Sequence, residues 1–142
     1  MATIYFSGSI SGGRNDVAIY QRFVATLRAA GHEVLAGAVA SEDVSAGGET
    51  LTPAAVFERD LAWLDAADLV VAEVSMPSLG VGYEIAYARY QRGIPVICLY
   101  RPAHTKRCSA MLSGDTGVEL IEYQDEPDGE TRLLESLARL GR

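Results

Sequence analysis

Segments with the pattern of a buried strand alternate with segments of helical periodicity along the whole chain of 142 residues. Short runs rich in apolar and β-branched residues lie at 2–6, 32–36, 68–74, 95–100 and 118–123. Segments typical of helices lie at about 16–30, 53–66, 81–92 and 130–140. Because strands joined through helices pair in parallel, this order predicts an α/β fold with a five-stranded, mostly parallel sheet. We expect a single doubly wound domain, Rossmann-like or flavodoxin-like, over residues 1–142.

Local signals indicate where the helices begin and end. Asp16 belongs to a residue type that caps helix N-termini, and Gly31 is of the type found just beyond a helix end. Pro53 favours the first turn of the second helix, and Gly93 favours the end of the third. The run LVVA (69–72) is apolar without alternation, which indicates a strand buried on both faces.

Charge and hydropathy exclude several classes of protein. The formal net charge is −7, and the 12 Lys and Arg residues are scattered. A nucleic-acid polymer needs a clustered basic surface and is not expected as a partner, whereas backbone amides can still hold a small anion. The longest apolar runs are too short to cross a bilayer, and the N-terminal segment lacks the basic start of a signal peptide. We therefore expect a cytoplasmic protein without a membrane partner.

The cysteines give no indication of a metal site. Cys98 lies within an apolar run and is expected in the core, while Cys108 lies in a polar stretch. The sequence has no Cys-x-x-Cys pair and no cluster of Cys and His, so we expect neither a metal site nor a disulfide framework. No metal or organic cofactor is expected.

Two glycine-rich loops follow predicted strands. Ligands of parallel α/β sheets bind at the carboxyl ends of the strands, which is where SGSISGG (7–13) and PSLGVG (77–82) lie. The first loop precedes a helix and is suited to a phosphate, although it has neither the P-loop pattern nor the dinucleotide-binding pattern. An ordinary flexible turn is an equal alternative for this loop.

Two carboxylates occupy unusual positions near these loops. In a helix over 53–66, Asp60 falls inside the apolar arc between Trp63 and Leu64. A buried ion pair or a capping bond would explain it, and so would a carboxylate that faces a cleft. Glu84 stands near a predicted helix start, where it either complements the helix dipole or faces the same cleft. Two carboxylates around one cleft suit glycosidic chemistry.

The chain resembles a known family over about residues 3–123. The segments YFSGSISGGR (5–14), RDLAWLDAADLVVAEV (59–74), PSLGVGYE (77–84) and SAM (109–111) are similar to the 2′-deoxynucleoside 5′-monophosphate N-glycosidases of the nucleoside 2-deoxyribosyltransferase superfamily. The resemblance implies hydrolysis of the N-glycosidic bond of such nucleotides to free base and 2-deoxyribose 5-phosphate, through a covalent glycosyl-enzyme intermediate.

The same resemblance implies the residues of the site. Glu84 matches the nucleophile, Asp60 the acid/base partner and Tyr5 the hydroxyl near the sugar that is linked to deoxyribose preference. We expect Asp60, in an apolar wall, to have a raised pKa and to supply a proton. The 5′-phosphate site is matched by Gly8, Ser9, Ile10 and Ser78. Gly80 matches a position where the backbone closely approaches the ligand. Ser109 and Met111 match residues that a neighbouring subunit delivers to the site, so the resemblance implies a homodimer.

Ser78 favours a nucleotide over a nucleoside. Related transferases that use unphosphorylated nucleosides typically have Asp at the corresponding position, and an acid would repel a phosphate, whereas a hydroxyl can donate to it. Two features depart from the family pattern. Ser11 stands where many members have Arg, and Arg14 or Arg101 would have to compensate for the missing charge. AGAVA (36–40) stands where the mammalian-type enzymes have a TEHVA segment, whose His is expected to reach the base. Base preference therefore stays open.

Three alternatives to the hydrolase also stay open. A deoxyribosyltransferase would pass the sugar to an acceptor base, and a ribonucleotide N-glycosidase of the kind that acts on CMP would accept a ribose; Tyr5 argues against the second. A nucleotide-binding sensor would turn nothing over. Retention of both Asp60 and Glu84 argues against a pure binder, because carboxylates repel an anionic ligand.

Overall fold

The computed structural model describes residues 1–10, 16–40, 50–103 and 107–142, which form one α/β domain. The five strands lie in the order β2-β1-β3-β4-β5, and every described pairing is parallel. Their bounds are β1 (Thr3–Ser7), β2 (Glu33–Leu35), β3 (Leu69–Glu73), β4 (Val96–Tyr100) and β5 (Glu119–Glu122). The predicted fold class and sheet are confirmed, and the strand order reverses between β1 and β3, which is where ligands of doubly wound folds bind.

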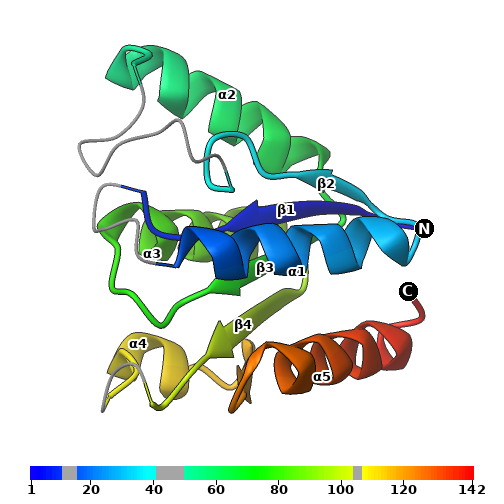
Figure 1. The fold of residues 1–142 in the computed structure, drawn as a ribbon. Helices are drawn as coiled ribbons and strands as arrows, with labels where there is room; N and C mark the ends of the chain where they lie inside the picture. The colour runs from blue at the N-terminus through cyan, green and yellow to red at the C-terminus, as the bar shows by residue number, and fades with distance from the viewer. Residues whose placement is uncertain (11–15, 41–49, 104–106) are drawn as a thin grey trace.

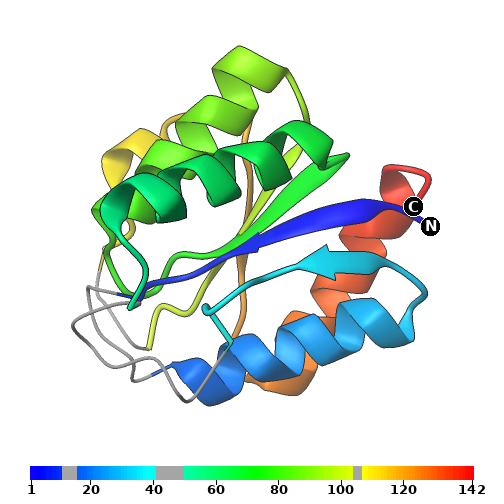
Figure 2. The ribbon, with the colours of Figure 1, turned by 90° about the horizontal axis from the view of Figure 1, so that it is seen from above.

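Helices cover both faces of this sheet. The helices α1 (Val17–Ala29) and α5 (Glu126–Arg139) lie on one face, while α2 (Pro53–Ala66) and α3 (Leu79–Ala86) lie on the other (Figures 1 and 2). A π-helical segment η1 (Tyr87–Arg92) continues α3, and a short helix α4 (Ala110–Ser113), which was not predicted, follows β4. The carboxyl ends of the strands point to the side of the molecule where α4 and the first turn of α2 lie (Figure 1).

Alternation along β1 divides the core into two layers. Ile4 and Phe6 pack with α1 and α5, whereas Tyr5 belongs to the cluster between the sheet and α2 and α3. Successive strand residues point to opposite faces, so β1 also directs Ser7 toward α2 and α3. Cys98 is fully buried in this second layer, as predicted, and burial raises the pKa of its thiol to about 12.

The predicted helix bounds hold where a local cap determines them. The helix α2 has the predicted bounds, because Thr52 accepts a hydrogen bond from the Ala55 amide at 3.2 Å and Pro53 fits the first turn. Asp16 does precede α1, but its side chain makes no capping bond, so that prediction was wrong. Its Oδ1 instead accepts a hydrogen bond from the Arg101 guanidinium at 3.1 Å.

The remaining differences lie at the ends of later elements. The third helix begins two residues earlier than predicted, because Ser78 caps it, and its last turn takes the π form up to Gly93, whose φ is 63°. The helix α5 begins four residues early, at Glu126, because Asp125 accepts a hydrogen bond from the Asp128 amide at 2.9 Å.

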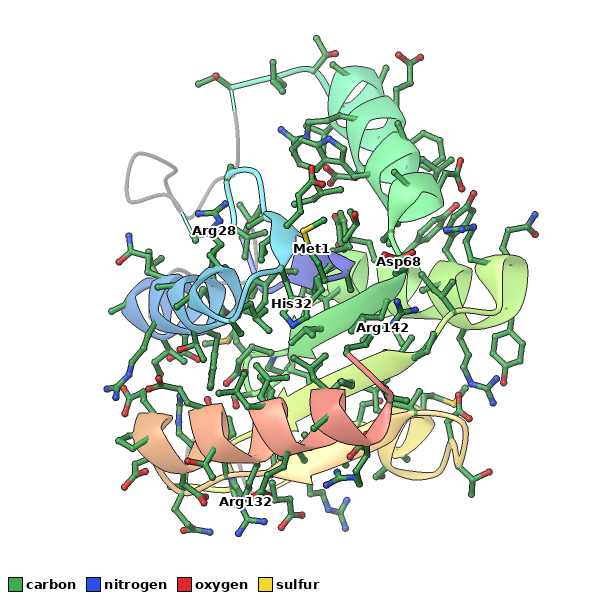
Figure 3. All side chains as sticks on the ribbon, turned by 90° about the vertical axis from the view of Figure 1, so that its right-hand side faces the viewer. Met1, Arg28, His32, Asp68, Arg132 and Arg142 are labelled. Carbon is green, nitrogen blue, oxygen red and sulfur yellow. The ribbon has the colours of Figure 1, made fainter. Side chains whose placement is uncertain are left out.

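The amino edge of the sheet is closed by short polar contacts. Figure 3 views this end, with Met1, His32 and Asp68 labelled. The amide of Ala2 donates to His32 Nδ1 at 3.0 Å, and the amide of Thr3 donates to Asp68 Oδ2 at 2.8 Å. These bonds satisfy backbone donors at the start of β1. In the part of the chain that the structure describes, no helix has the length and apolar character needed to span a membrane.

Candidate active site

A cavity of about 890 Å³ opens at the carboxyl edge, between α2, the first turns of α3 and the loop after β1. Its volume is that of sites for small organic ligands. The residues that line it are Gly8, Ile10, Leu51, Pro53, Val56, Phe57, Asp60, Leu61, Leu64, Pro77, Ser78, Leu79, Gly80, Val81, Tyr83 and Glu84. The structure therefore brings both predicted carboxylates, the described part of the first glycine-rich loop and the second such loop to one hollow.

Glu84 is anchored by β1. The Tyr5 hydroxyl donates to Glu84 Oε2, and the Ser7 hydroxyl donates to Oε1 at 3.3 Å. Burial raises the pKa of Glu84 to about 7, and the two hydrogen bonds act in the opposite direction. Ser7 was not singled out from the sequence, although its spacing of two from Tyr5 places both side chains on one face of a strand.

The helix-dipole explanation of Glu84 does not fit the structure. The helix α3 begins at Leu79, so Glu84 is its sixth residue, and the first turn contains no acidic residue. Stabilisation by the helix dipole falls off within the first turn. The position of Glu84 is thus explained by its contacts with β1 and its exposure to the cavity.

Tyr5 is a protonated hydrogen-bond donor. The residue is 3% exposed, and burial and the Glu84 carboxylate both raise the pKa of its hydroxyl above the usual value. The hydroxyl therefore keeps its proton and donates it to Glu84 in a hydrogen bond.

Asp60 faces the same cavity from α2. Both explanations left open by the sequence apply to it, because it lines the cavity and also forms an ion pair. Arg59 Nε and Nη2 each lie 2.9 Å from Asp60 Oδ1. The predicted apolar wall exists, with Leu61 and Leu64 among its members. The flexible stem of Arg59 lets its guanidinium reach the carboxylate of the neighbouring Asp60.

The loop after β1 packs tightly on α1. A Cβ at Gly8 would lie 3.0 Å from the Tyr20 ring, so glycine lets the loop approach this ring closely. Ser9 is fully buried, and its amide donates to the Tyr20 hydroxyl at 3.2 Å. Ile10 lines the cavity together with Gly8. Ser11 of the predicted phosphate loop and Arg14, which follows that loop, lie outside the described residues.

Ser78 caps α3 at the mouth of the cavity. Its Oγ accepts a hydrogen bond from the Val81 amide at 3.3 Å, which leaves the hydroxyl hydrogen able to donate elsewhere. A Cβ at Gly80 would meet Ser78 Oγ at 3.9 Å and no closer described atom. The described chain thus leaves room beside Gly80, on the side that lines the cavity.

Ser109 and Met111 lie apart from this cavity in the single chain. They line a second hollow of about 1080 Å³ between α3, η1 and α4, and Ser78 borders both hollows. Ser109 Oγ accepts a hydrogen bond from the Met111 amide at 3.3 Å, and Met111 is 82% exposed. The structure of one chain therefore does not bring these two residues to Glu84.

A buried polar cluster joins the carboxyl ends of β3, β4 and β5. Arg101 donates to Asp16 Oδ1 at 3.1 Å and to the Tyr123 hydroxyl at 3.2 Å. Tyr123 in turn donates to Glu73, which is fully buried and also accepts from the Ser75 amide at 2.6 Å. Burial raises the pKa of Glu73. Arg101, considered from the sequence as a substitute phosphate ligand, is engaged in this cluster.

Among the described residues, no group of three His, Cys, Asp or Glu side chains is arranged to hold a metal ion. In the described part of the chain, the cavity presents the carboxylates of Asp60 and Glu84 and the hydroxyls of Ser78 and Tyr83, and Arg59, Tyr5 and Ser7 contact the two carboxylates from behind. Such a set can supply a nucleophile and a proton carrier.

An α/β domain with a cavity at the carboxyl edge of a parallel sheet is the architecture of many enzymes that act on small molecules. Residues 4–125 match the family model described as nucleoside 2-deoxyribosyltransferase, and the chain belongs to this family.

Relatives with curated names are similar over most of the chain. A Mus musculus protein named 5-hydroxymethyl-dUMP N-hydrolase is 49% identical over 134 residues, which cover 93% of this chain and 76% of that protein. A Methanococcoides burtonii protein named putative 2′-deoxynucleoside 5′-phosphate N-hydrolase 1 is 43% identical over 117 residues, which cover 82% of this chain and 93% of that protein. The solved structure of a Clostridium botulinum CMP N-glycosidase shares the fold, with a TM-score of 0.69 at 18% identity. The match covers 94% of this chain and 98% of that one.

Proposed function

We propose that this chain hydrolyses the N-glycosidic bond of 2′-deoxynucleoside 5′-monophosphates and releases the free base and 2-deoxyribose 5-phosphate. The observation that carries the proposal is the Glu84 carboxylate, held by Tyr5 and Ser7 at a cavity that Asp60 also lines. The names of the relatives from Mus musculus and Methanococcoides burtonii support the same reaction.

In the first half of the reaction, an ionised Glu84 oxygen attacks C1′ of the sugar. The C1′–N bond breaks and its electron pair goes to the base nitrogen. The reactive form of the enzyme is the one in which Asp60 carries the proton and Glu84 does not, and Asp60 gives that proton to the departing base. The products of this step are the free base, a glycosyl ester of Glu84 and an ionised Asp60. The raised pKa of Glu84, about 7, means that ionisation of this group limits the step on the acid side.

In the second half, water replaces Glu84 at C1′. Asp60 accepts a proton from the water as its oxygen bonds to C1′, and the ester bond to Glu84 breaks with its electron pair returning to the carboxylate. The carboxylates regain their starting protonation states, and 2-deoxyribose 5-phosphate leaves. No group other than water is consumed.

Tyr5 supports a deoxyribose substrate. Its hydroxyl already donates to Glu84 Oε2. A 2′-hydroxyl of a ribose near C1′ would compete for that carboxylate and would need room beside a nearly buried ring. A deoxyribose makes neither demand, so we expect ribonucleotides to be poorer substrates.

The 5′-phosphate is assigned to the mouth of the cavity. Ser78 stands at the N-terminus of α3, where backbone amides and the helix dipole favour an anion. The loop of Gly8, Ser9 and Ile10 borders the same mouth, with Gly8 and Ile10 lining the cavity. Gly80 leaves room for close approach of the ligand. Binding through amides and hydroxyls is compatible with the net charge of −7.

We also propose that the chain works as a homodimer in the cytoplasm. Exposed apolar side chains surround the second hollow, with Leu79 97%, Tyr90 75% and Met111 82% exposed. A second copy that packs on these side chains would bury apolar surface. It would also bring its Ser109 and Met111 near Ser78, which borders both the second hollow and the mouth of the active-site cavity. Sedimentation equilibrium at micromolar concentration should give twice the mass of 15.2 kDa.

One assay tests the reaction. The protein is incubated with 5-hydroxymethyl-dUMP, the four common dNMPs, the four NMPs and the matching nucleosides, each with and without an acceptor base, and base release is followed by chromatography. We expect free base and 2-deoxyribose 5-phosphate from deoxynucleotides without an acceptor. Release that requires an acceptor would indicate a transferase, preference for CMP a ribonucleotide N-glycosidase, and binding without release a nucleotide sensor.

A further inference from the structure

Arg59 is held in place from three sides. Its Nε and Nη2 lie 2.9 Å from Asp60 Oδ1, and its Cζ lies 4.8 Å from the centre of the Trp63 ring, four residues along the same helix. The turn after β2 packs against this pair. A Cβ at Gly37 would lie 2.8 Å from the Trp63 ring and 3.6 Å from Arg59 Cζ. The guanidinium is therefore not a freely moving surface charge, although its side chain is 24% exposed.

The turn itself depends on glycine. Gly37 has a φ of +53°, a conformation that other residues rarely adopt, and it leaves no space for a side chain beside Trp63. Val39, two residues further, is buried in the core and anchors the turn. The segment 36–40 thus serves here to support Arg59 and Trp63.

Among the described residues, the charged and titratable groups at the two carboxylates come from three elements. Arg59 and Asp60 belong to α2, Tyr5 to β1 and Glu84 to α3. The Asp60 charge raises the pKa of Glu84, and the Arg59 charge lowers it. The Asp60 charge likewise raises the pKa of the Tyr5 hydroxyl, and the Arg59 charge lowers it. One cation therefore acts on every titratable group of the proposed reaction.

We propose that Arg59 is a positioning residue that acts as the counter-ion of the Asp60–Glu84 pair. It fixes the Asp60 carboxylate at the cavity and stabilises the negative charge that Asp60 acquires when it gives its proton to the departing base. This inference rests on the proposed roles of Asp60 and Glu84. It follows because a proton donor is stronger when its conjugate base is stabilised, and a fixed cation does so without reorganisation.

A purely structural role for Arg59 makes a different prediction. Stacking on Trp63 would contribute packing, and its loss would lower stability without moving the titration of the carboxylates. A counter-ion role requires the titration to move, because removal of a nearby positive charge raises the pKa of each carboxylate.

The deciding experiment titrates the free protein, with no turnover involved. The side-chain carboxyl carbons of Asp60 and Glu84 are followed by ¹³C NMR from pH 4 to 9 in the wild type, Arg59→Met and Arg59→Lys. Glu84→Gln and Asp60→Asn assign the signals, and circular dichroism checks the fold. We expect Arg59→Met to raise the pKa of both carboxyls by about one unit, and Arg59→Lys to restore most of the shift because the positive charge is kept.

Arg132→Met is the matched control. Arg132 lies 2.9 Å from Asp128 in an ion pair of similar length, on α5, which Figure 3 shows far from α2. Its removal should leave both titrations unchanged. If Arg59→Met also leaves them unchanged, or if Arg132→Met shifts them equally, Arg59 is not the counter-ion.

Activity gives a second measurement. In Arg59→Met, we expect kcat on a deoxynucleotide to fall about tenfold, KM to change less than about twofold, and both sides of the pH profile to move to higher pH. A fall in kcat with an unmoved profile overturns the counter-ion role. Shifted NMR titrations in a protein without any base release would support the counter-ion and reject the proposed hydrolysis, so the two failures are distinguishable.

Discussion

The Tyr5 hydroxyl donates a hydrogen bond to the Glu84 carboxylate although the two residues are 79 positions apart. This bond joins the centre of the sheet to the second turn of α3. It points one carboxylate oxygen at a fixed donor while Glu84 lines the cavity. Tyr5 thereby determines both the orientation of Glu84 and part of its pKa, and the first predictions depend on this relationship.

Removal of the Glu84 carboxylate should abolish base release. In Glu84→Gln, we expect kcat on deoxynucleotides to fall about a thousandfold or more, because an amide cannot form the glycosyl ester. Nucleotide binding, measured by calorimetry, should persist, since the proposed phosphate site does not include Glu84. Turnover near the wild-type rate in a pure Glu84→Ala preparation would show that Glu84 is not the nucleophile.

The acid side of the pH profile should report the ionisation of Glu84. Because the pKa of Glu84 in the free protein is about 7 and attack needs the ionised form, kcat/KM should be half-maximal near pH 7 and fall at lower pH. In Tyr5→Phe, a hydrogen bond that lowers this pKa is lost, so the half-maximal point should move to higher pH. Profiles of kcat/KM from pH 5 to 9 test both. A half-maximal point near 4.5, or one that Tyr5→Phe leaves unmoved, contradicts this assignment.

The same pKa predicts how stability depends on pH. The folded-state pKa of Glu84 is raised from 4.5 to about 7, so its contribution to stability is fully present below pH 4.5 and is lost as the pH rises through 7. Relative to Glu84→Gln, the wild type should therefore lose up to about 3 kcal/mol of unfolding free energy over this range. Urea denaturation of both proteins at several pH values measures the difference. A pH-independent difference would rule out a raised pKa.

Ser78 should discriminate between nucleotides and nucleosides. Asp also caps helices well, so Ser78→Asp keeps the start of α3 while it adds a negative charge at the proposed phosphate site. We expect kcat/KM on deoxynucleotides to fall about a hundredfold and that on nucleosides to change little, because about 3 kcal/mol is typical of losing a charge-assisted contact. The ratio of the two values is the measurement. Equal losses on both substrates would remove Ser78 from the phosphate site.

Arg101 should be important for stability. Its side chain is 14% exposed and lies between Asp16 and the fully buried Glu73, so Arg101→Met would leave buried carboxylates without their cation. We expect the free energy of unfolding to fall by about 3 kcal/mol. The double variant with Asp16→Asn should lose less than the two single losses together, because the two residues form one pair. A loss below about 1 kcal/mol would indicate that the cluster contributes little.

Local sequence signals determined much of the fold. Pro53 predicted the start of α2, and the structure adds the Thr52 cap, because signals at a helix start involve residues only a few positions apart. The apolar run in β3 was correctly predicted as buried on both faces, and the alternation of elements predicted the parallel sheet. The sequence also predicted that Glu84 and Asp60 share one cleft, and both line the same cavity.

Contacts between distant elements were decided only by the tertiary structure. Whether Asp16 caps α1 or pairs with Arg101 depends on how close the end of β4 lies to α1, and no local pattern encodes that distance. Ser7 joins Glu84, and the Gly37 turn meets Arg59, only because the sheet and α2 are stacked as they are. The sequence by itself determined which residues carry the proposed chemistry. Packing of the elements decided their hydrogen-bond partners and hence their charge states, because electrostatic energies depend on distance in space and on burial.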